Sequence, residues 1–479
     1  MVRDICIDFG ILKPFSQESP VASLHGSASE PPGRLSWTKS RLVCDHRGIL
    51  EERPSLKQKQ HFVVDLFAGC GGLSLGLERA GFTPALVNEL SPDAMATYLR
   101  NRHRVNPLLE SKYNIADIKQ LVLHDAAIDD LMDGFSVDYG IDARKGELDL
   151  VAGGPPCQGF SGIGHRRSFS VEKQQLPSNH LYEDMAYVVG RLRPKAFVFE
   201  NVRGLLHSKW TASGTNGEIW SDVLATFRSI GGYEVRWSLV RAKDYGTPQN
   251  RPRVIMVGLR EDVAGNANPD QHAEDAVAAG FLPKPTGGYP DLIDLLGDLV
   301  DPEYAPGGSS PFYLSDPQNA VQRLLRKDRS GRLRSQGLPL SEQEYSAHSP
   351  RIQEKFRFMH SNDGQIPEHL KTKKFAQKLL PPVWGAAGPT ITATSMPDDY
   401  VHFSQPRVPT VREWARLQMF PDWYEFSGKR TTGGIRRAGN PREGNFDREL
   451  PKYTQIGNAV PVNLAEAVGR HLRQVLHGA

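Results

Sequence analysis

A glycine-rich turn between an apolar strand and a helix constrains the fold of this chain more than any other feature. Residues 62–67 read FVVDLF, a compact apolar run that predicts a buried strand, and residues 68–76 continue as AGCGGLSLG. A helix is predicted to follow at 77–80. Such a turn lets a ligand approach the backbone at a helix N-terminus, as in nucleotide-binding parallel sheets. Because the glycine spacing is not the GxGxxG of dinucleotide sites, the turn alone identifies no ligand.

Strands and helices alternate after this turn. Glu89 ends the next predicted strand, at the place where such folds hold a ribose diol, and Asp117 and Ile118 precede a further helical stretch. The spacing predicts an open, mainly parallel α/β sheet of the Rossmann type, with the site at the C-terminal ends of its strands. The predicted elements are a strand at 85–89, a helix at 93–102 and a strand at 148–152.

A single cysteine stands on a stiff turn after the strand at 148–152. The sequence there is GGPPCQGFS, at 153–161, so two prolines precede Cys157. A reacting sulfur benefits from a backbone that cannot drift, which makes Cys157 a candidate nucleophile. A free cysteine is more often a small buried hydrophobe, and the residues of the turn alone leave both interpretations open.

Charged residues arrive at the same sheet edge from two later strands. The apolar run at 196–199 ends in Glu200. The sequence QNRPR at 249–253 places Arg251 and Arg253 just before another apolar run. Glu200 could act on a ligand or cap the next helix. The two guanidinium groups could bind an anion, support the cysteine turn or be solvated.

The composition excludes several classes of protein. The chain of 479 residues has four cysteines with no CxxC pair, which argues against a disulfide framework and a cysteine-rich zinc site, and we predict no metal site. No apolar run approaches the roughly 20 residues that cross a bilayer. The start of the chain, with Asp4 and Asp8, does not resemble a signal peptide. We therefore expect a soluble protein of a reducing cytoplasm.

Changes in composition divide the chain into three parts. Residues 1–60 are rich in Ser, Pro and Gly and predict a poorly ordered extension. Residues 61–260 carry the α/β pattern and are completed by 452–479, which contains an apolar helix at 464–472. Residues 261–451, rich in Gly, Pro and charge, predict a second, smaller domain.

The second predicted domain contains a basic segment. Between Ala320 and Leu380, thirteen Lys and Arg stand against six Asp and Glu, a local excess of +7 in a chain whose net charge is +3. This excess suits a nucleic-acid backbone, although a solvated helix face can carry the same charge. Residues 411–421 predict an amphipathic helix introduced by Thr410, which we interpret as scaffold.

Six segments, in this order, resemble the DNA (cytosine-5) methyltransferases of the prokaryotic restriction-modification type. The resemblance runs from about His61 to the C-terminus and leaves the first 60 residues outside. One such segment could arise by chance, whereas six in order are highly specific. They are DLFAGCGG at 65–72, GPPCQGFS at 154–161, ENV at 200–202, QNRPR at 249–253, REWARLQMFP at 412–421 and GNAVP at 457–461.

The resemblance implies covalent catalysis by Cys157. Cytosine C5 is a poor nucleophile, so the thiolate would add to C6 and make C5 able to attack the methyl group of S-adenosylmethionine. Glu200 would hydrogen-bond the exocyclic amine and share a proton with N3. Arg253 would hold the base, and Arg251 would stabilise the loop. Loss of the C5 proton and expulsion of Cys157 would then give 5-methylcytosine.

The same resemblance implies the residues that bind S-adenosylmethionine, the methyl donor. Where relatives often stack a large aromatic side chain on adenine, this chain has Leu90. The implied contacts are Phe67, Ala68, Gly69, Gly71 and Leu73 for the methionine portion, Glu89 for the ribose hydroxyls, Asp117 and Ile118 for adenine, Leu90, Pro156 and Leu181 in the same pocket, and Asn458 and Val460 closing it.

Access to the base implies a role for the remaining segments. A thiolate cannot reach C6 of a stacked base, so the cytosine must be flipped out of double-stranded DNA. The loop from Gln158 to about His180 would close over it, and residues 261–451 would read the major groove as a target-recognition domain. We expect a monomer whose functional counterpart is a restriction endonuclease, which neighbouring genes rather than this chain would identify.

Two alternatives remain open at this point. A tRNA-modifying branch shares the catalytic half, so tRNA cytosine-5 methylation is the enzymatic rival, and the basic second domain favours duplex DNA over it. A catalytically silent DNA-binding relative is the other alternative. The presence of Cys157, Glu200 and Arg253 favours an enzyme, because a silent copy is free to lose them.

Overall fold

The structure is a computed structural model. It divides into two units, Met1–Lys59 and Gln60–Ala479, and only the second is described below. The described residues are 60–478, apart from 157–178, 212, 268–269, 271, 372–376, 384–389, 393–398 and 432–448. The predicted poorly ordered extension and Cys157 therefore lie outside the described residues. Within the described part, no helix is long and apolar enough to cross a membrane.

A seven-stranded sheet forms the centre of the second unit, with the strand order β3-β2-β1-β4-β5-β7-β6. The neighbours from β3 to β5 are parallel, whereas β7 runs antiparallel to both β5 and β6. Helices cover both faces, which explains why the central strands read as continuous apolar runs. The predicted Rossmann-like sheet is confirmed. Its strands are β1 (His61–Leu66), β2 (Phe82–Asn88), β3 (Asn114–Ile115), β4 (Leu150–Gly153), β5 (Ala196–Val202), β6 (Tyr233–Arg241) and β7 (Pro252–Arg260).

The central strands end together at one edge of the sheet. Leu66 of β1 pairs with Gly153 of β4, and Gly153 pairs in turn with Phe199 of β5. On the other side of β5, Val202 pairs with Arg253 at the start of β7. The glycine-rich turn after β1, the proline turn after β4 and the polar end of β5 therefore meet at the same edge.

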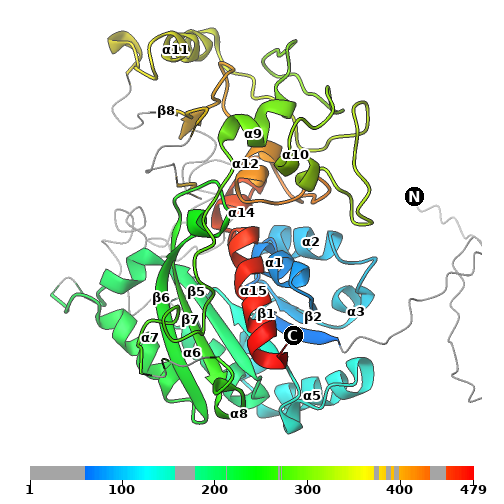
Figure 1. Cartoon of the computed structure of the whole chain (residues 1–479), viewed down its shortest axis with the longest axis vertical. Coiled ribbons are helices and arrows are strands. Elements are labelled where there is room, and N and C mark those ends of the chain that lie inside the picture. The colour runs from blue at the N-terminus through cyan, green and yellow to red at the C-terminus, as the bar shows by residue number, and fades with distance from the viewer. Residues whose placement is uncertain are drawn as a thin grey trace, which may run out of the picture. The chain divides into compact units, whose positions relative to one another are not determined.

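Helices pack on both faces of the sheet (Figure 1). One core joins the strands to α5, α6 and α7, and the other joins them to α1 and α15. The last helix of the chain thus packs on the first helix of this unit. The helices are α1 (Gly72–Arg79), α2 (Pro92–Arg100), α3 (Pro107–Ser111), α4 (Lys119–Val122), α5 (Asp125–Tyr139), α6 (Leu181–Leu192), α7 (Glu218–Arg228), α8 (Glu261–Ala264) and α15 (Val462–His477), with 3-10 turns at Ala143–Lys145, Arg203–His207 and Ala242–Tyr245.

A second group of elements lies between Leu292 and Asn458. Its largest core contains Trp414 and Tyr424, and Cys70 from the glycine-rich turn joins the same core. A smaller core surrounds α11. The elements are α9 (Leu292–Leu296), α10 (Ala320–Leu325), α11 (Pro350–Ser361), α12 (Val411–Leu417), α14 (Lys452–Asn458), the parallel pair β8 (Lys378–Leu379) and β9 (Tyr400–Val401), and 3-10 turns at Gly297–Leu299 and Glu368–Leu370.

Helix α12 differs from its prediction. Thr410 caps it as expected, since Glu413 N donates to Thr410 Oγ1 at 3.1 Å and Thr410 N donates to Glu413 Oε2 at 2.8 Å, a capping box. However, every residue of the helix is buried, including Arg412, Glu413 and Arg416. The sequence predicted an amphipathic helix, whereas the structure gives this helix no exposed face. The charged side chains stay inside because each finds buried hydrogen-bond partners.

Candidate active site

The turn after β1, residues 67–71, is called the glycine turn below, and its backbone favours glycine. The φ angles of Phe67, Gly69 and Gly71 are 54°, 57° and 84°, all left-handed. Phe67 adopts this conformation because Asn88 supports it: Phe67 N donates to Asn88 Oδ1 at 3.2 Å, and Ala68 N donates to the Asn88 carbonyl at 2.9 Å. A Cβ added to Gly69 would meet no atom within 4 Å. The turn therefore presents its backbone to open space.

Glu89 is held against the glycine turn. Its Oε2 accepts a hydrogen bond from Gly69 N at 2.8 Å, and its Oε1 accepts one from Ser91 N at 2.7 Å. Burial raises the pKa of this carboxyl group, although both main-chain donors favour its charged form. Each carboxylate oxygen keeps a second lone pair, so Glu89 can still accept hydrogen bonds from a ligand.

The C-terminal part of the chain returns to the start of α1. A Cβ built on Gly72 would lie 2.4 Å from the carbonyl oxygen of Val460, so only glycine fits at this crossing. Leu73 is buried in the core shared with α15. Asn458 is exposed. The structure thus brings Val460 next to the glycine turn.

The other predicted donor-binding residues lie around the same edge. Leu90 is 71% exposed, and Asp117 is also exposed, with Oδ1 accepting from Lys119 N at 2.9 Å. Ile118 belongs to the core of the sheet, and Leu181, the first residue of α6, packs partly against that core. Pro156 is exposed.

Asn88 was not predicted as part of the site. Besides supporting Phe67, its Nδ2 donates to the carbonyls of Ile115 and Ala116, at 3.0 and 3.1 Å, just before Asp117. One side chain therefore ties together the two loops predicted to hold the methionine and adenine portions of the donor. An asparagine inside an otherwise apolar strand end was the signal in the sequence.

Glu200 and Arg253 form an ion pair at the same sheet edge. Arg253 Nε lies 2.6 Å from Glu200 Oε1, and their side chains are 9% and 11% exposed. A Cβ added to Gly154 would lie 3.0 Å from Glu200 Oε2, so the carboxylate borders the proline turn. The predicted acid and the predicted cysteine turn are thus neighbours in space.

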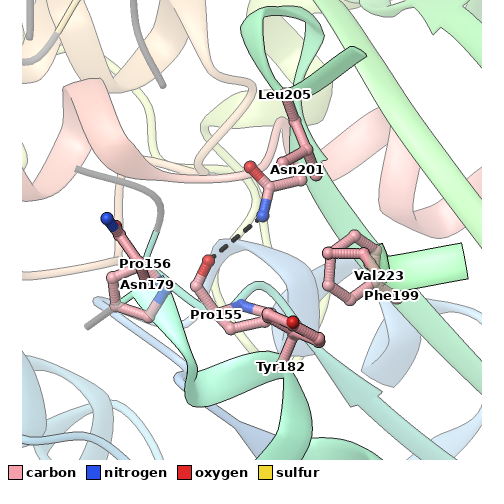
Figure 2. Close-up of a pocket in the computed structure, with 8 residues that line it drawn as sticks. All are labelled: Pro155, Pro156, Asn179, Tyr182, Phe199, Asn201, Leu205 and Val223. Atoms are coloured by element: carbon pink, nitrogen blue, oxygen red, sulfur yellow. Dashed lines mark hydrogen bonds between the residues drawn. The ribbon is translucent and has the colours of Figure 1, made fainter. Parts of the chain in front are cut away.

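Asn201 holds the proline turn, the segment after β4 that contains Pro155 and Pro156, by a hydrogen bond. Figure 2 shows the Asn201 amide directed at the Pro155 carbonyl, and Nδ2 donates to this oxygen at 3.2 Å. A small pocket lies beside this bond, with about 10 Å³ of free space, room for no more than a water-sized group. Its lining consists of Pro155, Pro156, Asn179, Tyr182, Phe199, Asn201, Leu205 and Val223. This free space is too small to receive a base.

Arg251 points away from the ion pair, into the protein. Its guanidinium group donates to the main-chain carbonyls of Ile391, Gly457 and Ala459. Burial, and then the charge of Arg253, lower the pKa of Arg251 well below its usual value. This arginine therefore joins β7 to the segment that brings Val460 to the glycine turn.

A cluster at the opposite edge of the sheet combines His61, Asp149 and His477. One atom from each lies within 4.8 Å of the others, a spacing that could hold a metal ion. However, Lys195 Nζ lies 2.6 Å from Asp149 Oδ1, and Phe62 N donates to Asp149 Oδ2 at 2.9 Å. The carboxylate thus already has a cationic partner, which argues for a structural role of this cluster.

Comparisons with known proteins agree with this geometry. The chain matches the family model of C-5 cytosine-specific DNA methylases over residues 62–474. It is 31% identical to Type II methyltransferase M.DdeI of Desulfomicrobium norvegicum, over 86% of this chain and 88% of that protein. It is 30% identical to Type II methyltransferase M.XorII of Xanthomonas oryzae, over 86% and 84% respectively.

Among solved structures, a DNA modification methyltransferase encoded within a prophage of E. coli is similar to the chain. Its TM-score is 0.58 and its sequence identity is 25%, over 87% of this chain and 99% of that one. Enzymes of this family use S-adenosylmethionine as the methyl donor. Because the family model spans nearly all of the second unit, the chain belongs to the C-5 cytosine-specific DNA methylases.

Proposed function

We propose that this chain methylates C5 of a cytosine flipped out of double-stranded DNA, through a covalent bond between Cys157 and C6. Family membership gives the overall reaction, methyl transfer from S-adenosylmethionine to cytosine C5 of DNA. One observation carries the rest: the Glu200–Arg253 ion pair borders the turn that leads to Cys157. The glycine turn follows β1, the strand beside β4, so donor and base would meet at this edge.

Cys157 is the proposed nucleophile. The thiolate lone pair forms the S–C6 bond, and the C5–C6 π electrons then let C5 attack the sulfonium methyl group. The S–CH3 bond would break, and its electrons would stay on the sulfur of the released S-adenosylhomocysteine. A base removes the C5 proton, its electrons restore the C5–C6 double bond, and the S–C6 bond breaks to return the thiolate. The hydrogen bond from Asn201 to Pro155 supports this role, because it limits the drift of the backbone two residues before the sulfur.

Glu200 and Arg253 are proposed to act on the cytosine ring. Glu200 Oε2, which borders Gly154, would accept from the exocyclic amine, and the carboxyl group would hold a proton at N3 as electron density moves into the ring. Arg253, paired with Oε1, would orient the carboxyl group and offset the negative charge that develops. Arg251 would stabilise the loops, as its three main-chain acceptors suggest.

The glycine turn and Glu89 fit the methyl donor. The open space next to Gly69 leaves room for the methionine portion, and Glu89 retains acceptor capacity for two ribose hydroxyls. Asp117, exposed beyond β3, would accept from the adenine amine. S-adenosylmethionine supplies the methyl group as a sulfonium electrophile when it is bound here. Phe67, Leu181 and Val460 would form the apolar walls.

Residues 261–451 are proposed to recognise DNA in its major groove. The basic excess between Ala320 and Leu380 supports contact with phosphates. Base flipping follows from the need of a thiolate to reach C6, which lies inside the stack of a duplex. The names of the relatives, Type II methyltransferases, support a modification enzyme whose DNA sequence is also the target of a restriction endonuclease.

The test of this proposal is transfer of a tritiated methyl group from S-adenosylmethionine to duplex DNA or to tRNA. We expect label in the DNA, recovered as 5-methylcytosine, and none with Cys157→Ser. Cys44→Ser, outside the family match, is the matched control and should label as well as the wild type. Label in tRNA alone would support the RNA alternative, and no label in either would support a silent DNA-binding relative.

A further inference from the structure

We propose that Tyr424 is a positioning residue for the methyl donor and that Arg102 acts with it. The two side chains hold the glycine turn by its main-chain carbonyls, and they link donor affinity to the segment that follows α12. This inference rests on the proposed function in one respect, namely that the glycine turn binds the donor. In the sequence, Tyr424 is far from the glycine turn and belongs to the predicted second domain.

Two consecutive carbonyls of the glycine turn are held by these side chains. Tyr424 Oη donates to the Cys70 carbonyl at 2.6 Å, and Arg102 Nη2 donates to the Gly71 carbonyl at 3.3 Å. Arg102 Nη1 donates to Tyr424 Oη at 3.0 Å, so the two holders also fix one another. Burial raises the pKa of the Tyr424 phenol, which keeps it protonated and able to donate.

The side chains around Gly71 are closely packed against it. A Cβ added there would lie 2.8 Å from Tyr424 Oη, 2.9 Å from Arg102 Nη1 and 2.9 Å from Tyr98 Cδ2. The guanidinium group of Arg102 is buried, lies 3.8 Å from the centre of the Tyr98 ring, and is neutralised by Glu78 Oε1 at 2.5 Å. A shift of either side chain would therefore move the turn.

Tyr424 is in turn fixed to α12. Arg412 of that helix donates from Nη2 to the Tyr424 carbonyl at 2.8 Å and from Nη1 to the Pro421 carbonyl at 3.1 Å. The neighbouring Glu425 is clamped by Asn101, which donates from Nδ2 to its carbonyl at 2.8 Å and accepts from its N at 3.1 Å. A displacement of α12 is thus transmitted through a continuous series of hydrogen bonds to the glycine turn.

A purely structural role for Tyr424 is the alternative. The ring packs against Phe420 and Phe426, with centroids 4.9 and 5.6 Å away, and Tyr424→Phe preserves this packing while it removes the hydroxyl group. Tyr313→Phe is the matched control. It also removes a buried hydroxyl hydrogen bond in the same core, but this hydroxyl donates to Asp422 Oδ2, at 2.8 Å, and not to the glycine turn.

The experiment measures the dissociation constant of S-adenosylhomocysteine, the donor's product, for the full chain by titration calorimetry without DNA, and the KM for donor and for DNA. We expect Tyr424→Phe to weaken binding about 5- to 10-fold and to raise the KM for donor by a similar factor, with the KM for DNA unchanged. Tyr313→Phe should stay within about 2-fold of the wild type, although both variants lose similar thermal stability.

Equal donor affinity in wild type and Tyr424→Phe would overturn the inference, as would equal weakening by both variants. If Tyr424→Phe does not fold, Arg102→Lys decides by the same criteria, because Lys keeps the pair with Glu78 but cannot reach both Tyr424 and the Gly71 carbonyl. A wild-type chain that binds no S-adenosylhomocysteine would instead refute the donor site itself, which separates the two failures.

Discussion

Two regions of this molecule bury arginine–carboxylate pairs, and they use them differently. In α12, Arg416 binds Asp298 through Nη1 and Nη2 and Asp422 through Nε and Nη2, and all three side chains are fully buried. At the sheet edge, Arg253 meets Glu200 through one nitrogen, and both side chains keep about a tenth of their surface exposed. In the first region, all four oxygens of Asp298 and Asp422 accept hydrogen bonds from buried protein groups. The second retains lone pairs for a ligand, which distinguishes a site from a scaffold.

The same contrast holds for protonation. Within α12, burial alone would raise the pKa of Glu413, but Arg407, together with His402 and the Thr410 N–H, outweighs it and lowers the pKa to about 2. Below the glycine turn, burial raises the pKa of Asp65 to about 7, even though Ser74 donates a hydrogen bond to it. Glu413 therefore stays charged over the whole physiological range, whereas Asp65, next to the glycine turn, changes its charge within that range.

The largest expected effect is on catalysis at the sheet edge. Glu200→Gln keeps an oxygen that can accept from Arg253 but cannot share a proton with the base. We expect kcat to fall about 10²- to 10⁴-fold, while the free energy of unfolding in urea changes by under about 2 kcal/mol. Single-turnover kinetics and urea denaturation measure the two quantities. A large loss of unfolding free energy with an unchanged kcat per folded molecule would show that Glu200 has a structural role, and it would contradict the comparison.

The opposite result is expected beside α12. Arg416→Met leaves Asp422 buried without its ion-pair partner and leaves Asp298 with Arg326 alone, so the free energy of unfolding should fall by about 3–5 kcal/mol. At saturating S-adenosylmethionine, kcat per folded molecule should remain close to that of the wild type, because Arg416 makes neither of the two hydrogen bonds that hold the carbonyls of Cys70 and Gly71. Arg470→Met is the control, since Arg470 is 64% exposed and pairs with Glu466 on the surface of α15, and its substitution should cost no more than about 1 kcal/mol.

The protonation of Asp65 predicts a dependence of stability on pH. The folded chain holds this proton up to about pH 7, whereas the unfolded chain releases it near 3.8. The stability from this proton is therefore fully present below 3.8 and is lost as the pH rises to about 7. Between pH 5 and pH 8 the wild type should lose about 2–3 kcal/mol relative to Asp65→Asn in urea denaturation. Parallel stability curves for the two proteins would contradict the assigned burial effect.

The smallest expected effect is at the cap of α12. Thr410→Ala removes the side-chain acceptor of the Glu413 N–H and the donor to Gln343 Oε1 at 2.7 Å, and it should lower the free energy of unfolding by about 1–2 kcal/mol. Ser91→Ala is a useful comparison, because Ser91 Oγ accepts from Ala94 N at 3.4 Å, a longer bond at the start of α2. We expect a smaller loss there. A larger loss at Ser91 would show that the length of the cap hydrogen bond does not determine how much each cap contributes to stability.

The sequence predicted the sheet edge better than the interior of the second region. Parallel strands bring their C-terminal ends together, so the meeting of Glu200 with the cysteine turn followed from strand order. The burial of Arg416 did not follow, because charged residues at helical spacing usually face water and their buried partners come from distant segments. Arg102 and Tyr424 are in contact although 322 positions separate them in the sequence, so no local sequence pattern could predict this contact.

The central claim is that a bond forms between Cys157 and cytosine at the edge bordered by Glu200. Duplex DNA in which 5-fluorocytosine replaces cytosine tests it directly, because fluorine in place of the C5 proton blocks the elimination that releases the sulfur. After incubation with S-adenosylmethionine, mass spectrometry of the digested protein should find a nucleotide on the peptide that contains Cys157, and none with Cys157→Ser. Methylation of ordinary duplex DNA without any such adduct, or an adduct on another cysteine, would contradict the account.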